Sequence, residues 1–296
     1  MAERAETQYL NLLRDIRDNG EVRNDRTGTG THSHFGEQMK YNMREGAPIL
    51  TSKRVALGAV AHELIWMLHG DSNIQYLAQN NVKIWNEWAF TPTLKKAGIE
   101  IPEQGSPEWN ELMEGYINKI RTDDEFAQQH GDLGPVYGYQ WRHAPKDGAG
   151  EVDQIVAVQD AIRHNPDSRR IIVDSWNVGQ IDQMALPPCH LLYHFYASNE
   201  KDEASGKPYL DMKLYQRSAD MFLGVPFNMA QYAMLLSMMA QSTDREPRYF
   251  IHSFGDTHIY SNHAEQVDLQ LSRANSLYPA PRIELNPDIK DITQFT

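Results

Sequence analysis

The stretch that decides the fold class runs from residue 169 to residue 260. It holds three β-rich runs, Arg170-Ile-Ile-Val-Asp-Ser-Trp176, His190-Leu-Leu-Tyr-His-Phe-Tyr196 and Tyr209-Leu-Asp-Met-Lys-Leu-Tyr215. A Met- and Leu-rich helix is expected over 227–241, and another short strand over 249–254. Turn residues separate these runs, as expected for strands. Helices and strands mix without regular βαβ alternation, so the sequence predicts an α+β fold.

The chain before residue 169 is expected to be mostly helical. Apolar residues at helical spacing mark a first helix, which Asn19-Gly20 ends: Tyr9, Leu12, Leu13 and Ile16. A nearly all-apolar helix over 57–68 should be buried. Residues 91–131 are more polar, with a helix opening at Ser106-Pro107. We interpret 91–131 as an inserted helical surface subdomain of a single domain that spans 1–296.

Composition narrows the class of protein. The chain has 296 residues, a net charge of −12 and one cysteine. It has no apolar run of the roughly 18 residues that a membrane span needs, and its charged N-terminus is not a signal peptide. We therefore expect a cytoplasmic protein in a reducing environment. The acidic balance argues against DNA or RNA bound along a broad surface, but a few arginines can still bind a small anion.

The single cysteine lies in Leu186-Pro-Pro-Cys189-His190. It cannot form an intramolecular disulfide, so it is either an inert core residue or a nucleophile. Two prolines restrict the backbone just before the cysteine, a histidine follows it, and the neighbouring chain is rich in arginine. A thiolate needs positive surroundings near neutral pH, so these neighbours favour chemistry.

Four arginines stand out as candidates for a phosphate site, because a guanidinium donates two parallel hydrogen bonds to phosphate. They are Arg26, in the polar, glycine-rich loop 24–31, the pair Arg169 and Arg170, and Arg217, which Ser218 follows. The alternative is that all four are solvated surface charges.

Asn228 follows Pro226-Phe227 at the start of the expected helix. It can cap that helix, since asparagine is a preferred N-cap. Alternatively, its carboxamide, with one acceptor and one donor group, can pair with a pyrimidine edge. A flipped amide would match cytosine as well as uracil, so Asn228 alone leaves the base undecided.

Glu63 lies in the middle of the apolar helix 57–68 and is costly there if it is ionised and unpaired. It is either paired or kept for proton transfer. Trp85-Asn-Glu-Trp88 forms part of the core or stacks on a flat ring. Five further residues are plausible site residues: Tyr137, His190, Asp220, His258 and Tyr260. Neither a metal-ligand spacing nor a phosphate-binding P-loop is present.

Taken together, these segments resemble the thymidylate synthase family, in order along the chain from about residue 8 to 293. The segments are Asn24-Asp-Arg-Thr-Gly-Thr-Gly-Thr31, His62-Glu-Leu-Ile-Trp66, Ile84-Trp-Asn-Glu-Trp88, Gly131-Asp-Leu-Gly-Pro-Val-Tyr-Gly138, Asp167-Ser-Arg-Arg-Ile-Ile-Val173, Met184-Ala-Leu-Pro-Pro-Cys-His190, Leu214-Tyr-Gln-Arg-Ser218, Pro226-Phe-Asn228 and Gly255-Asp-Thr-His-Ile-Tyr-Ser-Asn-His263. The resemblance implies a large, twisted mixed β-sheet packed with helices, with one sheet face forming a homodimer interface.

The resemblance also implies the reaction, which is transfer of a one-carbon unit from 5,10-methylenetetrahydrofolate to C5 of dUMP, giving dTMP and dihydrofolate without a metal. Cys189 would attack C6 of dUMP. The implied catalytic set is Cys189, Glu63, Tyr137, His190, Asn228 and Arg217. The implied substrate-binding set is Arg26, Arg217, Ser218, Gln216, Asp220, Asn228, His258 and Tyr260, with Arg169 and Arg170 donated by the partner subunit. The implied folate-binding set is Lys53, Trp85, Trp88, Asp220 and Gly224.

The sequence departs from the family pattern at its end. Members that make dTMP carry a tail that closes over the folate, whereas this sequence stops at Asp291-Ile-Thr-Gln-Phe-Thr296. There are three explanations: the tail is missing from this sequence, the protein is inactive, or it is a related enzyme whose active site admits water. Water in place of hydride would give a hydroxymethyl product, so a dUMP hydroxymethylase, or less readily a dCMP hydroxymethylase, is one alternative. A nucleotide- or RNA-binding protein with a dead site is the other.

Overall fold

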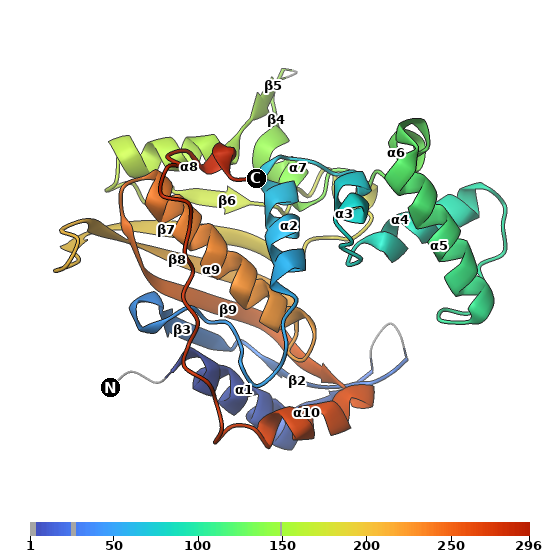
Figure 1. Cartoon of the computed structure of the whole chain (residues 1–296), viewed down its shortest axis with the longest axis horizontal. Helices are drawn as coiled ribbons and strands as arrows, with labels where there is room; N and C mark the ends of the chain where they lie inside the picture. Colours follow the sequence, from blue (N-terminus) through green and yellow to red (C-terminus); the bar gives the residue numbers. More distant parts are fainter. Residues whose placement is uncertain (1–3, 25–27, 149) are drawn as a thin grey trace. The chain divides into compact units, whose positions relative to one another are not determined.

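The computed structural model describes residues 4–24, 28–148 and 150–296, and these divide into two compact units. The first unit comprises residues up to 60 together with 155–174 and 189–296, and the second comprises 61–154 and 175–188. Figure 1 labels the elements. Among the described residues, no helix is both long and apolar enough to cross a membrane.

The first unit is built on one mixed sheet with the strand order β1-β2-β9-β8-β7-β6, and β3 also pairs with β9. The strands are β1 (Glu21–Arg23), β2 (Thr31–Phe35), β3 (Gln38–Asn42), β6 (Ile172–Asp174), β7 (His190–Lys201), β8 (Pro208–Asp220) and β9 (Glu246–Tyr260). Among the strands of the described residues, only β8 and β9 run parallel, and β2 and β3 pair with the two halves of β9. The predicted α+β fold with a large mixed sheet is confirmed.

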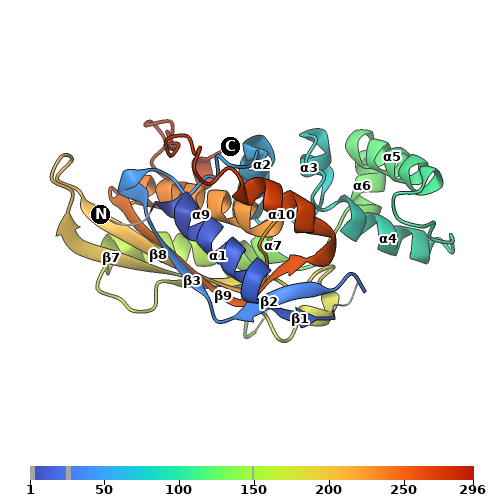
Figure 2. The same ribbon diagram turned by 90° about the horizontal axis from the view of Figure 1, so that it is seen from below.

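Helices cover one face of this sheet. The helices of the first unit are α1 (Ala5–Asn19), α8 (Gln154–His164, which begins at the last residue of the second unit), α9 (Gly224–Ser242) and α10 (Ala264–Leu271), with short 3₁₀ turns at Met43–Glu45, Ser261–His263 and Ile292–Gln294. Figure 2 shows α1, α9 and α10 on the same side of the strands. α1 is amphipathic, and its Tyr9, Leu13 and Ile16 are fully buried. α9 is apolar nearly all round, as expected for a central helix.

On the strands of this sheet, side chains of the other face alternate with the buried ones, because successive residues of a strand point to opposite faces. Tyr196 on β7 is 64% exposed, and Tyr215 on β8 and Ile172 on β6 are also exposed. This face therefore carries aromatic and apolar side chains in contact with solvent.

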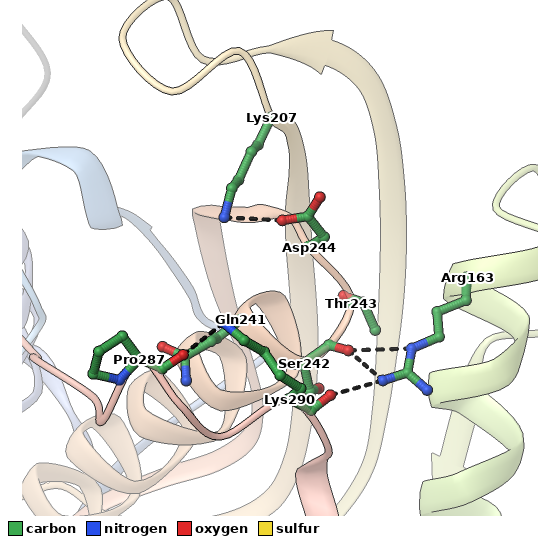
Figure 3. A pocket seen from close by; sticks show the side chains of 8 residues that line it. All are labelled: Arg163, Lys207, Gln241, Ser242, Thr243, Asp244, Pro287 and Lys290. Atoms are coloured by element: carbon green, nitrogen blue, oxygen red, sulfur yellow. Dashed lines mark hydrogen bonds and ion pairs between the residues drawn. The ribbon is translucent and has the colours of Figure 1, made fainter.

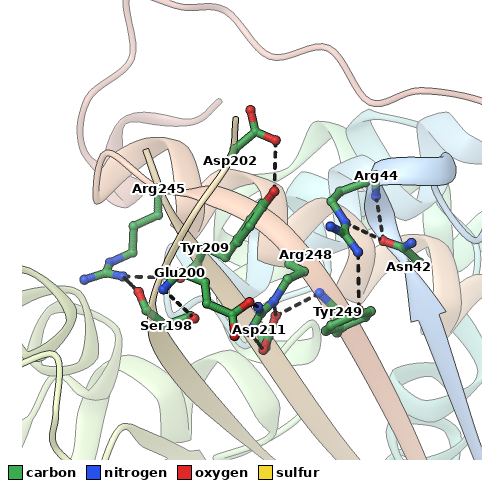
Figure 4. A network of polar contacts seen from close by, with 10 residues as sticks. All are labelled: Asn42, Arg44, Ser198, Glu200, Asp202, Tyr209, Asp211, Arg245, Arg248 and Tyr249. Atoms are coloured by element: carbon green, nitrogen blue, oxygen red, sulfur yellow. Dashed lines mark hydrogen bonds and ion pairs between the residues drawn. The ribbon is translucent and has the colours of Figure 1, made fainter. Parts of the chain in front are cut away.

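Two polar networks hold the ends of these elements. Arg248 of β9 forms a bidentate ion pair with Asp211 of β8, at 2.9 and 2.7 Å, and binds Glu200 of β7 at 2.6 Å (Figure 4). At the end of α9, Arg163 of α8 donates to the carbonyl oxygens of Ser242 and Lys290 (Figure 3). The first network joins three strands, and the second attaches the C-terminal segment to α8 and α9.

The second unit is mainly helical. Its helices are α2 (Leu57–Leu68, whose first residues lie in the first unit), α3 (Gln75–Gln79), α4 (Asn86–Lys96), α5 (Pro107–Thr122), α6 (Asp124–His130) and α7 (Tyr137–His143), and it also has the strands β4 (Ala144–Lys146) and β5 (Gly150–Val152) and a 3₁₀ turn at Ile181–Gln183. α2 has the predicted bounds. α5 begins as expected, because Ser106 Oγ accepts the Trp109 N–H and Pro107 is the first helical residue. Residues 91–131 hold the last part of α4 and the whole of α5 and α6.

Four strand and loop predictions need correction. The run 170–176 is a strand only over Ile172–Asp174, and β8 extends beyond the predicted run 209–215 as far as Asp220. The expected strand 249–254 extends to Tyr260, so His258 lies on a strand. Strands β2 and β3 were not predicted. β2 is polar until Phe35, and β3 alternates polar with apolar residues over only five positions, which is too short for a clear period.

Candidate active site

Cys189 lies one residue before β7 and is held next to the neighbouring strand β8. The Arg217 N–H donates to the Cys189 carbonyl oxygen at 2.8 Å, which fixes the backbone of the cysteine. The Arg217 guanidinium Nη2 lies 3.9 Å from the Cys189 sulfur, and the cysteine is half-buried. A cation at this distance favours the thiolate over the thiol. The geometry therefore supports the nucleophile interpretation of Cys189.

Gly255 of β9 lets β8 approach closely at Arg217. A Cβ at this position would lie 2.7 Å from the Arg217 carbonyl oxygen and 3.1 Å from Tyr215 Oη. The first contact is with backbone, which cannot turn aside as a side chain can. The position of Arg217 thus depends on the absence of a side chain at 255.

We predict that Gly255→Ala lowers both stability and the binding of phosphate-bearing ligands. Overpacking of this kind costs about 1–3 kcal/mol, and here it would displace the strand that carries Arg217. Urea denaturation and equilibrium dialysis with dUMP measure the two effects. Gly58→Ala is the matched control, because a Cβ there meets nothing within 4 Å. Unchanged dUMP binding in Gly255→Ala would contradict the assigned role of this close contact.

Asn228 lies inside α9, in its second turn, so the helix-capping interpretation is wrong. The N-cap residue is Leu223, whose side chain makes no capping bond. The Asn228 Oδ1 instead accepts a hydrogen bond from Gln216 Nε2 of β8 at 3.1 Å. A carboxamide held in this way suits base recognition, since its orientation is set before a ligand arrives.

His258 and Tyr260 lie together at the end of β9, with their rings edge to face at a centroid distance of 5.2 Å. The His258 Nδ1 is 2.8 Å from Asp256 Oδ1, and Asp256 Oδ2 also binds Arg23 at 3.0 Å. The carboxylate accepts from Nδ1, which leaves the Nε2 of a neutral ring as an acceptor. Asp256 is thus an orienting residue that the sequence prediction missed.

His190 is buried, and its Nδ1 lies 2.6 Å from the hydroxyl of Tyr232 in α9. Burial lowers the pKa of His190 to about 3. The ring is therefore neutral across the physiological range, and it can relay a hydrogen bond but cannot supply a standing charge. Tyr232 is a second partner that the sequence prediction missed.

This pKa predicts a pH-dependent loss of stability. Because the folded-state pKa lies below the unfolded value, the unfolded chain takes up a proton first as the pH falls from about 6.5 toward about 3. Wild type should lose about 2 kcal/mol of unfolding free energy between pH 7 and pH 5 relative to His190→Asn. Urea titrations of both proteins at the two pH values measure this difference. Parallel pH profiles would show that His190 is not buried in its neutral form.

The turn between β8 and α9 gathers the candidate folate residues of the first unit. Asp220 Oδ1 accepts the N–H groups of Phe222 and Leu223, both at 3.0 Å. Lys53 donates to the Phe222 carbonyl oxygen, and its Nζ lies 3.5 Å from the centroid of the Phe222 ring. Burial lowers the pKa of Lys53 to about 8, against the opposing effect of the Asp220 charge. A Cβ at Gly224 would meet Asp220 and Asn228 only at ordinary contact distances.

The other predicted phosphate ligands are placed differently. Ser218 lies next to Arg217 on β8 and is half-buried. Arg169 and Arg170 are exposed in the turn before β6, and neither forms an ion pair within the described parts of the chain. This placement leaves both guanidinium groups open to a ligand or to another chain. Arg26 lies outside the described residues.

The second unit brings Glu63, Trp85 and Tyr137 together. The Trp85 Nε1–H donates to Glu63 Oε1 at 2.7 Å, and the Trp85 and Tyr137 rings meet edge to face at 5.8 Å. Glu63 is 7% exposed, so its carboxylate is kept away from bulk water. Trp85 is also buried, whereas Trp88 on α4 is half-exposed. Among the described residues, no cluster of histidine, cysteine and carboxylate side chains could hold a metal ion.

The family model for thymidylate synthase matches residues 7–296. The chain belongs to the thymidylate synthase family. It is similar to the thymidylate synthase of Aster yellows witches'-broom phytoplasma (strain AYWB), with 48% identity over 287 residues, which cover 97% of this chain and 91% of that protein. The predicted family and enzyme type, a thymidylate synthase-type methyltransferase of dTMP biosynthesis, are thereby confirmed.

Membership in the thymidylate synthase family gives the two clusters a common chemistry. The first unit holds a thiol, cations and a fixed carboxamide, which suit attack on a phosphorylated pyrimidine. The second holds a buried carboxylate with an N–H donor, which suits proton transfer.

Proposed function

We propose that this thymidylate synthase converts dUMP to dTMP through a covalent bond between Cys189 and C6 of the pyrimidine. The observation that carries the proposal is the Cys189 sulfur 3.9 Å from the Arg217 guanidinium, with the backbone of both residues joined by a hydrogen bond. C5 of uracil is a poor nucleophile. Addition of the thiolate at C6 moves an electron pair toward O4, and the resulting enolate carbon at C5 becomes nucleophilic.

The residues of the first unit would bind and polarise dUMP. Arg217 and Ser218 would hold its phosphate, together with Arg26 and with Arg169 and Arg170 of the partner subunit. The phosphate carries about −1.5 to −2 charges, fewer than the four arginines supply, so positive potential remains to favour the Cys189 thiolate. Asn228 would pair with the uracil edge and stabilise charge at O4. His258 and Tyr260 would bind the 3′-hydroxyl of the deoxyribose.

The proton transfers would fall to Glu63, Tyr137 and His190. After the one-carbon unit is attached, loss of the proton on C5 would expel tetrahydrofolate and leave an exocyclic methylene at C5. Transfer of a hydride from the folate would convert this group to methyl, and release of the Cys189 thiolate from C6 would restore the ring. A buried carboxylate can accept and return protons because its charged form is not overstabilised by water. His190, neutral at physiological pH, would pass a hydrogen bond through Tyr232.

The co-substrate would be 5,10-methylenetetrahydrofolate, which supplies the one-carbon unit and the hydride. The residue types fit a folate. Asp220 is a carboxylate that can accept from a ring amino group, Lys53 is a cation for an acidic tail, and half-exposed Trp88 offers a face for stacking. Buried Trp85 is better suited to orient Glu63. No residue is assigned to a metal.

We further propose a homodimer that works in the cytoplasm and forms through the open sheet face. Exposed Tyr196, Tyr215 and Ile172 supply the apolar surface that such an interface needs. The single cysteine suits a reducing compartment. Residues 91–131 are proposed to form an inserted surface subdomain of a single catalytic domain over 1–296. Sedimentation equilibrium should give the mass of a dimer, and Tyr196→Glu should shift it toward the monomer.

Product identification tests the proposed reaction. The protein is incubated with dUMP and methylenetetrahydrofolate, and the products are separated by chromatography. Equal amounts of dTMP and dihydrofolate are expected. Hydroxymethyl-dUMP with tetrahydrofolate would assign a hydroxymethylase instead, and bound dUMP without product would assign a binding protein.

A further inference from the structure

A chain of hydrogen bonds, one buried and two part-buried, leads from the centre of the sheet to Asn228. The His252 Nε2 of β9 lies 2.8 Å from Gln216 Oε1 of β8. The Gln216 Nε2 lies 3.1 Å from Asn228 Oδ1 and 3.0 Å from the carbonyl oxygen of Ser218. His252 is 0% exposed and Gln216 is 2% exposed. The Gln216 end of each bond is therefore shielded from water.

The Ser218 carbonyl oxygen sets the direction of every bond in this chain. A backbone carbonyl can only accept, so the atom that faces it must be the NH₂ group of Gln216. Gln216 Oε1 therefore faces His252, and the His252 Nε2 must carry a hydrogen. The second N–H of Gln216 points at Asn228, so Asn228 must present its oxygen there.

His252 is held in the state that this chain requires. Burial, together with the nearby His190, lowers the pKa of His252 well below its usual value, so the ring is neutral and has one N–H. The ring lies between Phe250 and Phe254, with centroid distances of 5.4 and 4.0 Å. Within the described residues, the His252 Nδ1 has no hydrogen-bond partner. A neutral ring with its proton on Nε2 donates to Gln216 and leaves no N–H on the Nδ1 that lacks a partner.

We propose that His252 is a positioning residue, which fixes the orientation of the Asn228 carboxamide through Gln216 and thereby discriminates between uracil and cytosine nucleotides. The inference rests on the proposed function, in which Asn228 pairs with the pyrimidine. A uracil edge presents an N3–H donor and an O4 acceptor, and cytosine presents the reverse. A carboxamide with a fixed orientation matches one edge and opposes the other, and the substrate of the reaction is dUMP.

Turning the Asn228 amide to suit cytosine would place its NH₂ group against the NH₂ group of Gln216. One buried donor would then lose its acceptor, which corresponds to a preference of roughly 5- to 150-fold between the orientations. Without His252, Gln216 loses the donor to its oxygen and is held by two bonds instead of three. Removal of His252 should therefore weaken the preference for one Asn228 orientation without abolishing it.

The test compares the dissociation constants of dUMP and dCMP, measured by isothermal titration calorimetry on the full chain. In His252→Phe, which keeps a ring between Phe250 and Phe254, dUMP should bind about ten-fold more weakly. Binding of dCMP should change by less than about three-fold, since it does not use the fixed orientation. The ratio of the two constants, and not either constant alone, is the decisive readout.

A second variant should move the ratio further. In Gln216→Glu the carboxylate has no N–H to donate, so Asn228 would turn its NH₂ group toward position 216. The preference should then shift further toward dCMP than in His252→Phe. A general loss of structure cannot favour one nucleotide in this way.

Tyr41→Phe is the matched control. Like His252→Phe it removes one buried polar group beside β9, because the Tyr41 hydroxyl binds only the sulfur of Met39 in the described structure. Its ratio should equal that of wild type. Equal losses for dUMP and dCMP in His252→Phe, or an unchanged ratio in Gln216→Glu, would overturn the positioning role alone. Wild type that does not prefer dUMP would overturn the proposed function and this inference with it.

Discussion

Replacement of Cys189 by serine should abolish turnover, with kcat falling by at least about 10³-fold. A hydroxyl is far less acidic than a thiol, so the Arg217 guanidinium 3.9 Å away cannot make it ionise near neutral pH. Without the anion, C6 of the pyrimidine is not attacked and C5 never becomes nucleophilic. A steady-state assay of dTMP formation measures the loss.

The same variant carries its own control. Serine is close to cysteine in size. Arg217 is also held by its backbone bond to the carbonyl oxygen of residue 189, and the bond between Gln216 and Asn228 does not involve the sulfur. The dissociation constant for dUMP should therefore stay within about three-fold of wild type. A Cys189→Ser enzyme that keeps kcat within ten-fold would exclude Cys189 as the nucleophile.

Glu63→Gln should give the second largest effect, a fall in kcat of about 10²- to 10⁴-fold, with little change in the KM for dUMP. Glutamine preserves the size of the side chain and can still accept the Trp85 N–H, but it cannot take up or release a proton. The proton steps at the pyrimidine would then depend on Tyr137, His190 and water. Steady-state kinetics separate the effect on kcat from the effect on KM.

Glu6→Gln is the matched control for this prediction. Glu6 is also a buried carboxylate, at 5% exposure, but it accepts from Thr51 and Ser52 in the first unit. Its replacement should lower stability and leave kcat unchanged. If both variants lost the same activity, the effect at Glu63 would be structural and its proton-transfer role would be excluded.

The sequence predicted the elements with strong local patterns. The bounds of α2 follow from its nearly all-apolar composition, and α1 ends where Asn19-Gly20 predicts. The lengths of β8 and β9 were underestimated, since the β-rich runs recognised in the sequence stop at Tyr215 and Phe254. The strand conformation of the residues beyond these runs depends on pairing between β8 and β9, which are distant in the sequence, and no local pattern contains that pairing.

The sequence predicted only part of the candidate site. Residues with distinctive chemistry, such as Cys189 and Arg217, could be singled out by their neighbours and by family resemblance. His252 and Tyr232 could not, because each acts through a partner on another element. Asp256 lies on the same strand as His258, and only the structure shows its carboxylate in contact with that ring. Asn228 shows the limit most clearly. Its place after Pro-Phe suggested a helix cap, and only the contact with Gln216 revealed its fixed orientation.

The central claim is the covalent bond between Cys189 and C6 of the nucleotide, and trapping that bond tests it most directly. A dUMP analogue with fluorine at C5 cannot lose that substituent as a proton, so the adduct should accumulate in the presence of methylenetetrahydrofolate. Mass spectrometry of the denatured, digested protein should find the added mass on the peptide that contains Cys189. The same mass on another residue, or no adduct in an enzyme that turns over dUMP, would contradict the account.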